Sequence, residues 1–407
     1  MSRASDAGGD APLAAKINLG QTLRLGNDSS VALLWAITLL LTGIGLIMVL
    51  SASSITSFTR DQGFLGVFWR QALFAAIGLP LMIVAATRRL DFWKRYAWAF
   101  FGIGLALQFL VFTPLGFEVG GNRNWIQIGS FGAQPSEALK LALVVWIGTV
   151  LLAKEPLLGR MRHELIPVIF PGALFALGLV VLGQDLGTTM IMAALVIGAM
   201  FFGGVSWKSL GLVILGGATA VFLFVISSEN RMERLFGHAS GNIDYSGLGW
   251  QPQHGLWALA SGGLFGVGLG GSKAKWNWLP AAENDYIFAI IGEELGFVGA
   301  MLVIALFIVL AIVMLRVIVR ARDRFGRAVV GGALVWIIGQ AFVNIGVVIG
   351  VFPVIGVPLP LISAGGTALI SCLIVMGIVI SIARDGAEYQ SERETARPRP
   401  SFRGSVR

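Results

Sequence analysis

The chain has 407 residues, of which 56% are hydrophobic and only 13% are charged, and its net charge is +8. Soluble domains carry about 25% charged residues, so this composition excludes an ordinary soluble protein. Apolar runs of about 20 residues, each long enough to cross a bilayer as a helix, recur along the chain and are continuous rather than alternating, which also excludes a β-barrel.

The apolar runs predict an all-α integral membrane protein, a polytopic bundle of ten transmembrane helices. The predicted spans are residues 31–53, 69–87, 96–113, 137–153, 165–182, 186–203, 208–227, 286–315, 328–350 and 363–383. With the N and C termini in the cytoplasm, 22 of the 30 Lys and Arg residues fall in cytoplasmic segments, as the positive-inside rule requires. This placement accounts for the basic charge without nucleic acid.

Three regions follow from this topology. Residues 31–383 form the membrane domain, and the tails 1–30 and 384–407 are expected to be disordered because they are too polar to bury a core. The largest extracytoplasmic loop, residues 228–285, joins the seventh and eighth spans. A second outward loop covers residues 114–136. The one cysteine, Cys372, lies in the last span and has no partner for an intrachain disulfide.

Charged residues near the ends of spans are candidate site residues, because a charge in the membrane is costly and usually faces a cavity or a partner. In "QPSEALK", Glu137 and Lys140 lie three residues apart on one helix face. They either pair with each other or present Lys140 to an anionic headgroup. In "GQDLGTT", Gln184 and Asp185 precede the sixth span, where Asp185 either caps the helix or contributes to a site.

Asp285 begins the eighth span, and Glu293 lies two turns further in, where an isolated carboxylate requires a partner. The preceding run "ASGGLFGVGLGGSKAKW" lacks the Gly-Lys-Ser/Thr of a P-loop, so no ATP site is predicted. Its amides and Lys275 either hold a diphosphate or pack as a loop. The histidines are too few and too isolated to predict a metal site.

The segment "GVFPVIGVPLPLISAGGT", residues 350–367, contains three prolines and cannot form a continuous helix. Irregular backbone at membrane depth is tolerated where it is buried or lines a cavity, so we expect a re-entrant loop at the floor of a pocket. In the largest outward loop, Asp244 stands in "DYSG", which taken alone is equally typical of an ordinary turn.

Together these segments resemble the SEDS family (shape, elongation, division and sporulation), and more its division members than its elongation members. The matching blocks are "LSASS", "GGNRNWIQIGSFGAQPSEALKL", "GQDLGTTM", "DYSGLGWQ", "ALASGGLFGVGLGGSKAKWNWLP", "NDYIFAIIGEELGFVGA" and "PVIGVPLPLISAGGTALI". They extend from the first predicted span to the last. The chain departs from the common pattern at Glu283, Asn284, Tyr245 and within residues 363–367.

The resemblance implies a peptidoglycan glycosyltransferase of the plasma membrane that polymerises lipid II into glycan strands at the division septum. Its implied partners are a class B penicillin-binding protein, which is a transpeptidase, and other division proteins. Asp244, seven residues before Gln251, matches the catalytic Asp of the family. The residues that match its substrate-binding positions or lie in its matching blocks are Arg123, Glu137, Lys140, Gln184, Asp185, Lys275, Asp285, Glu293 and Ser363.

The chemistry needs a single base, because the diphosphate of the donor leaves as a stabilised anion. We expect Asp244 to deprotonate the acceptor 4-hydroxyl, which attacks the anomeric carbon with inversion and releases undecaprenyl diphosphate. Arg123, Lys140 and Lys275 are expected to neutralise the diphosphate, together with a divalent cation (Mg²⁺ or Mn²⁺) and without a nucleotide. The alternatives are a lipid II flippase or transporter, an elongation-type polymerase, and a structural recruiter of division proteins.

Overall fold

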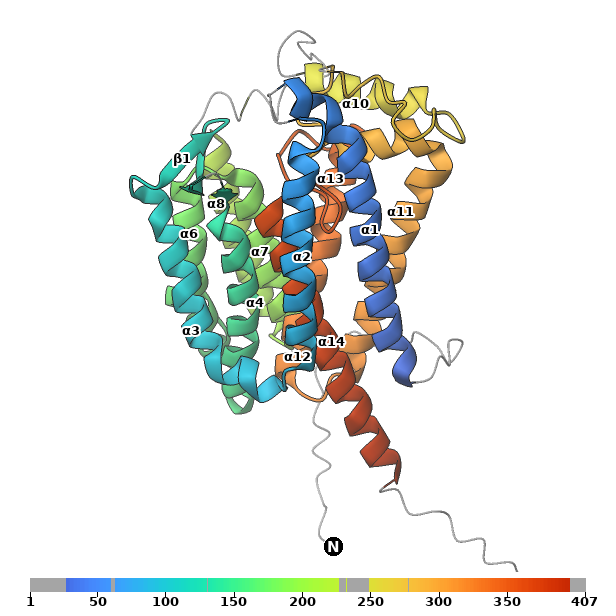
Figure 1. Ribbon diagram of the computed structural model, residues 1–407. Helices are drawn as coiled ribbons and strands as arrows, with labels where there is room; N and C mark the ends of the chain where they lie inside the picture. The colour runs from blue at the N-terminus through green and yellow to red at the C-terminus, as the bar shows by residue number, and fades with distance from the viewer. Residues whose placement is uncertain are drawn as a thin grey trace, which may run out of the picture.

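The computed structural model describes residues 27–59, 63–129, 131–226, 232, 249–276 and 278–395. Most of the helices run side by side and form one bundle (Figure 1). Those of the first half are α1 (Asn27–Thr59), α2 (Gly66–Thr87), α3 (Leu90–Phe109), α4 (Pro135–Ala153), α5 (Met161–Val168), α6 (Leu174–Leu182), α7 (Leu186–Phe202) and α8 (Trp207–Ile226). Those of the second half are α10 (Trp250–Ser261), α11 (Ile287–Arg320), α12 (Arg324–Leu334), α13 (Gln340–Val348) and α14 (Gly366–Thr395).

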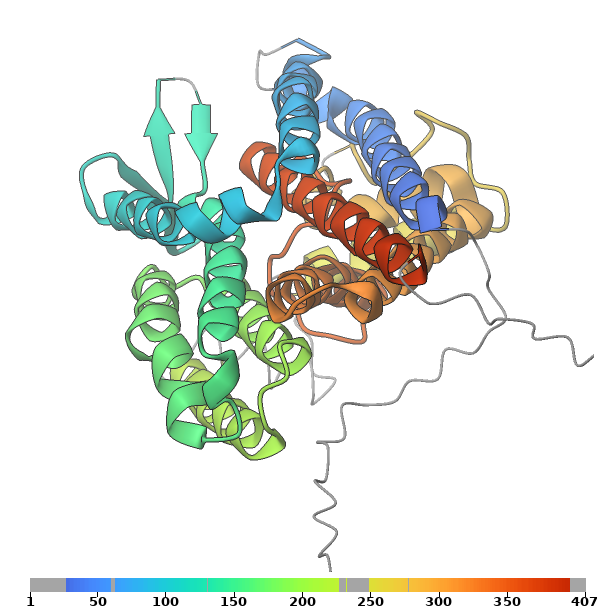
Figure 2. The ribbon, with the colours of Figure 1, turned by 90° about the horizontal axis from the view of Figure 1, so that it is seen from below.

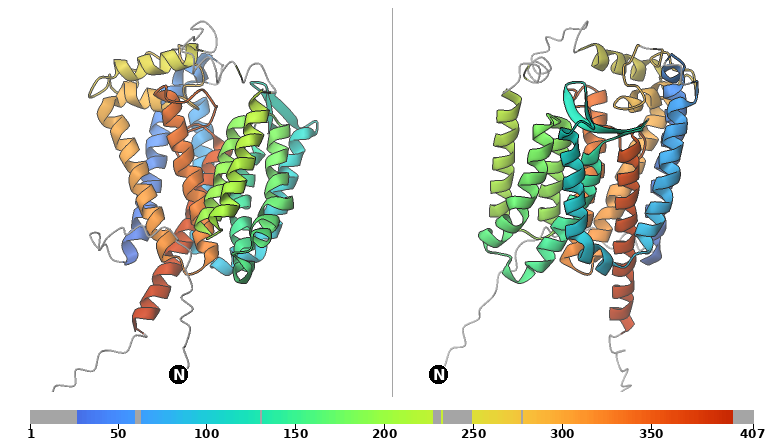
Figure 3. Two further views of the ribbon diagram at one scale, coloured as in Figure 1. Left: turned by 180° about the vertical axis from the view of Figure 1, so that it is seen from behind. Right: turned by 60° about the vertical axis from the view of Figure 1, so that its left-hand side comes forward.

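Eight helical segments within the described residues are long and apolar enough to cross a membrane. Two shorter apolar helices, α7 and α8, stand among them (Figure 3). Each predicted span overlaps one of these ten segments, so the prediction of a helical membrane bundle is confirmed. The last helix continues to Thr395, so the first part of the tail that was expected to be disordered is helical. It projects from the end of the bundle opposite to α10.

Two of the spans contain π-helical turns. Between α5 and α6 a π-helical turn (Ile169–Ala173) contains Phe170 with φ −114° and ψ 127°, next to Pro171, which cannot donate a helical hydrogen bond. A second π-helical turn (Val335–Gly339) joins α12 to α13. Such turns frequently occur at functional sites because they rotate the following side chains relative to a regular helix. The residue that follows the second turn is Gln340, and its side chain reaches the cavity described below.

The glycine-rich run packs against a break in α11. Gly296 has φ +69°, and the amides of Val267 and Gly268 donate hydrogen bonds to the carbonyls of Glu293 and Glu294 at 3.0 and 3.1 Å. A Cβ on Gly266 would lie 2.1 Å from the carbonyl oxygen of Glu294. These amides are therefore occupied by helix carbonyls, which favours the loop-packing interpretation of this run over a diphosphate cradle.

The centre of the bundle is formed by α4, α7, α12 and α14. Of the candidate spans, α4 has the largest buried share. Small residues allow close approach: a Cβ on Gly332 of α12 would lie 2.4 Å from a methyl group of Val144 on α4. Seen from below, α14 lies between α2 on one side and α12 and α11 on the other (Figure 2). Helix packing through small residues is expected in lipid, where the hydrophobic effect does not drive helices together.

The end of the bundle opposite to the projecting part of α14, which we call the outer end, carries the irregular structure. A three-stranded antiparallel sheet of order β1-β2-β3 is formed by β1 (Gly116–Val119), β2 (Asn122–Ile128) and β3 (Phe131–Ala133), in a region that the sequence predicts only as a loop. The amide of Arg123 donates to the carbonyl of Gly183 at 2.9 Å, which ties β2 to the turn between α6 and α7. Helix α10 lies across the same end of the bundle (Figure 1).

Candidate functional site

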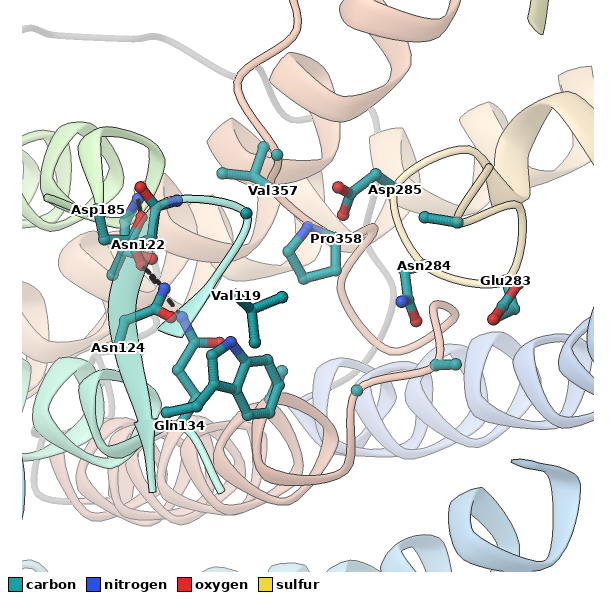
Figure 4. A pocket seen from close by; sticks show the side chains of 18 of the residues that line it. Val119, Asn122, Asn124, Gln134, Asp185, Glu283, Asn284, Asp285, Val357 and Pro358 are labelled. Atoms are coloured by element: carbon teal, nitrogen blue, oxygen red, sulfur yellow. Dashed lines mark hydrogen bonds between the residues drawn. The ribbon is translucent and has the colours of Figure 1, made fainter. Parts of the chain in front are cut away.

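A cavity of about 1010 Å³ lies at this outer end, between the sheet, α2, α4, α10 and two irregular segments (Figure 4). One segment comprises residues 280–285, which lead into α11, and the other comprises residues 353–358 between α13 and α14. The second segment is the proline-rich stretch that the sequence predicts to line a pocket, and that prediction is confirmed. The N-terminal ends of α7 and α14, together with Gln340 of α13, complete the lining.

One wall of the cavity is built around Asp185. Its Oδ1 accepts a hydrogen bond from the amide of Thr188 at 2.9 Å and so caps α7, while its Oδ2 accepts from the side-chain amides of Asn124 and Gln134 (Figure 4). Asp185 therefore caps the helix and lines the cavity at once. Gln184, its neighbour in the sequence, has φ +61° and is not among the described lining residues.

Glu137 and Lys140 lie on α4 and form an ion pair, with 2.7 Å between Lys140 Nζ and Glu137 Oε1. Lys140 also donates to Gln340 Oε1 at 3.2 Å, and its ammonium lies 5.0 Å from the ring centroid of Trp336. Gln340 in turn donates to the carbonyl of Pro358. Glu137 and Lys140 both line the cavity and pair with each other, so the two interpretations of this motif are compatible.

The segment before α11 contributes Glu283, Asn284 and Asp285 (Figure 4). Burial raises the pKa of Asp285 to about 6, with smaller contributions from the negative charges of Asp185 and Glu283. Ser363 supports this wall rather than lining it: its hydroxyl donates to the carbonyl of Asn284 at 2.6 Å and accepts from the amide of Leu359. A carboxyl with a pKa near neutrality can exchange protons with a bound molecule at physiological pH.

Lys275 and Glu293 belong to a separate buried group, which we call the outer cluster (Ser51, Ser272, Lys275, Glu293 and Glu294). Lys275 Nζ donates to the carbonyl of Gly270 at 2.7 Å and lies 3.2 Å from Glu294 Oε1. The hydroxyl of Ser51 on α1 donates to both Glu294 oxygens. Glu293 accepts from Ser272 and from the amides of Lys273 and Ala274. The structure therefore does not bring Lys275 or Glu293 together with Lys140.

Arg123 also points away from the cavity lining. Its guanidinium donates to the carbonyls of Val111 and Thr113, at 3.0 Å each, and so holds the 3₁₀ turn (Leu110–Phe112) that ends α3. A different cation, Arg70 in the first turn of α2, lines the cavity with Lys140. The sequence gives one signal for Arg70, which is a charge at the start of a predicted span.

Asp244 lies outside the described residues. The chain that follows it does reach the cavity, because Gly249, Trp250 and Gln251 line it. The Trp250 indole stacks on the ring of His254 at a centroid distance of 3.9 Å, and its N–H donates to the carbonyl of Trp278 at 2.9 Å. Gln251 donates to the carbonyl of Pro280 at 2.8 Å. The start of α10 is thereby fixed to the segment that carries Asp285.

The described residues contain no group of three or more His, Cys, Asp and Glu side chains able to hold a metal ion. The two carboxylates of Asp185 and Asp285 nonetheless line one cavity and interact electrostatically. Mg²⁺ commonly binds through one or two carboxylates together with substrate phosphates. The described lining therefore fits a divalent cation that arrives with a diphosphate.

Comparison with known proteins places the chain in a family. The family model FTSW_RODA_SPOVE, described as cell cycle protein, matches residues 31–388. The "Probable peptidoglycan glycosyltransferase FtsW" of Mycobacterium tuberculosis is 39% identical over 365 residues, which cover 88% of this chain and 69% of that protein. The "Stage V sporulation protein E" of Bacillus subtilis is 37% identical over 360 residues, covering 86% of this chain and 96% of that protein.

Two solved structures share the fold. One belongs to a study of "structural coordination of polymerization and crosslinking by a peptidoglycan synthase complex"; it is 25% identical, with a TM-score of 0.69, and the match covers 88% of this chain and 97% of that chain. The other is the rod shape determining protein RodA of Thermus thermophilus, 25% identical with a TM-score of 0.64, covering 90% of this chain and 99% of that chain.

Proposed function

This chain belongs to the FtsW, RodA and SpoVE family of cell cycle proteins, and we propose that it acts as a peptidoglycan glycosyltransferase of the FtsW type. It is a multi-pass membrane protein whose relatives carry that activity in their names. The observation that supports the activity most directly is the large polar cavity at the outer end of the bundle, with the Glu137–Lys140 pair among its lining residues. A polymerase of lipid-linked sugars needs such a cavity at the surface where its substrate is presented.

In this proposal the substrate is lipid II and the product is the growing glycan strand. Asp244 accepts the proton of the acceptor hydroxyl, the hydroxyl oxygen attacks the anomeric carbon of the donor, and undecaprenyl diphosphate leaves. Support for this role comes from the "DYSGLGWQ" block and from the position of Trp250 and Gln251, the end of that block, in the cavity lining. One base is sufficient because the leaving group is already a stabilised anion.

The remaining charges divide into two roles. Lys140 and Arg70 are the described cations of the cavity and are proposed to offset the diphosphate charge, with a divalent cation that takes most of its ligands from the phosphates. Asp185 and Asp285 are proposed to contact the substrate or that cation. Arg123, Gln184, Lys275, Glu293 and Ser363 are proposed to act indirectly, by holding the elements that carry the lining residues.

The proposal also specifies topology and setting. The two shorter apolar helices, α7 and α8, complete ten spans, both termini lie in the cytoplasm, and the loop between α8 and α11 lies outside. The protein works at the division septum of the plasma membrane with a class B penicillin-binding protein and other division proteins. The comparison with a peptidoglycan synthase complex supports a crosslinking partner.

The test is reconstitution of the purified chain with labelled lipid II, with and without the class B penicillin-binding protein. We expect glycan strands to form only when this chain is present. A flippase is the competing function, because it also needs a polar cavity and interrupted helices. If the chain translocates the lipid II headgroup across the membrane of proteoliposomes and forms no glycan, the proposal is wrong and the chain is a flippase.

A further inference from the structure

The polar side chains of the cavity suit a sugar better than a diphosphate. Among the described lining residues eight are Asn or Gln, four are Asp or Glu, and two are Arg or Lys. Carboxamides both donate and accept hydrogen bonds, whereas carboxylates only accept. A diphosphate offers acceptors alone, while the hydroxyl and acetamido groups of a sugar offer donors and acceptors. The polar side chains of the lining therefore include both donors and acceptors, as a saccharide requires.

Two tryptophans, Trp125 on β2 and Trp250 on α10, provide apolar faces in the same cavity. The Trp250 indole is held by its stacking on His254 and by its hydrogen bond to Trp278, so little side-chain entropy remains to be lost on binding. Trp125 pairs across the strands with Phe117. The face of a pyranose that carries axial C–H groups is apolar and weakly positive, which complements the negative face of an indole ring.

We propose that Trp125 and Trp250 are stacking platforms for the sugar rings of the substrate. The inference rests on the proposed function, because it assigns parts of one lipid-linked saccharide to different walls of the cavity. The diphosphate lies near the two cations, Lys140 and Arg70. The saccharide occupies the rest of the cavity, which is rich in carboxamide side chains.

The experiment compares two ligands, lipid II and undecaprenyl diphosphate, of which the second lacks the disaccharide and its stem peptide. Their dissociation constants are measured for the full-length wild-type protein in nanodiscs and for the variants Trp250→Ala and Trp125→Ala. Each variant is expected to bind lipid II roughly tenfold more weakly and undecaprenyl diphosphate within about twofold of the wild type. Trp250→Phe, which keeps an aromatic face, is expected to recover much of the lipid II affinity.

The matched control is Trp276→Ala, because Trp276 is 60% exposed and is not among the described lining residues. It is expected to bind both ligands as the wild type does. Equal weakening of both ligands by Trp250→Ala at an unchanged melting temperature, or no weakening of either, would overturn the inference. If the wild type binds lipid II in this sugar-dependent way but forms no glycan, the proposed function fails while the saccharide site stands.

Discussion

Lys140 and Glu137 form an ion pair at 2.7 Å although each residue exposes only 2% of its surface. They lie one turn apart at the start of α4, and the ammonium is further bound by Gln340. Removing one partner of a buried pair leaves an uncompensated charge, which costs about 3–5 kcal/mol. This relationship makes the pair both a structural element and a part of the cavity.

The change Lys140→Met is therefore expected to destabilise the protein by about 3–5 kcal/mol. The double variant Glu137→Gln with Lys140→Met should recover most of that loss, because it removes both charges, and should stay inactive because the cavity lacks its ammonium. Thermal unfolding and lipid II polymerisation measure the two effects. The control is Lys94→Met, which breaks a more exposed pair with Asp323 at the opposite end of the bundle and should cost about 1 kcal/mol or less. A double variant as unstable as the single one would contradict the prediction.

The raised pKa of Asp285 predicts that the stability of the folded protein depends on pH. Its folded pKa of about 6 lies above the ordinary value of 3.8, so the folded state holds a proton that the unfolded state releases. Stability should fall as pH rises from about 4 to about 6, and the deficit above that range is about 3 kcal/mol. Asp285→Asn should therefore raise the melting temperature near neutral pH, leave it unchanged near pH 4, and lower polymerisation.

The control for this series is Asp91→Asn, because the side chain of Asp91 is 78% exposed. It is expected to shift the melting temperature little at either pH. An Asp285→Asn variant whose melting temperature differs from the wild type by the same amount at both pH values would show that the carboxyl does not titrate as expected.

Asp244→Asn should abolish glycan polymerisation, because an amide cannot accept the proton of the acceptor hydroxyl. Binding of lipid II and the melting temperature should stay near those of the wild type, since the substitution preserves size. Polymerisation by the purified variant with its penicillin-binding partner is the measurement. Polymerisation by the variant at the wild-type rate would show that Asp244 is not the base. If the substitution also leaves cell division unaffected, the alternative function as a structural recruiter of division proteins is favoured.

Substitutions in the outer cluster are expected to lower the stability of the protein without lowering its affinity for lipid II. Lys275→Met leaves the buried Glu294 without its cation and should cost about 3–5 kcal/mol, whereas Ser51→Ala removes one neutral donor and should cost about 1–3 kcal/mol. Lipid II affinity should remain near the wild-type value in the folded fraction, because neither residue is among the described lining residues. Lost affinity at an unchanged melting temperature would instead place Lys275 on the substrate.

The sequence by itself determines the membrane character, the approximate position of each long apolar helix and the family, but not the helix α10, which lies in a predicted loop. These properties are local: a run of about 20 apolar residues can satisfy its backbone in lipid only as a helix, whatever surrounds it. Motif spacing within one helix or turn identified Glu137, Lys140, Asp185 and Asp285 as candidates, all four of which line the cavity, and the prolines of residues 350–367 predicted its irregular wall. The helical continuation of α14 and the small sheet were not predicted, since both lie outside the apolar pattern.

Only the tertiary structure decided which charged residues share the cavity. Lys140 lies at the start of α4 and Lys275 in the irregular segment before α11. Lys275 pairs with Glu294 beside α1, whereas Lys140 pairs with Glu137 in the cavity. Arg123 binds backbone carbonyls, while Arg70, Asn124 and Gln340 converge from three separate elements. Hydropathy and spacing describe each helix alone. The contacts between segments far apart in the chain depend on how the helices pack and rotate against one another.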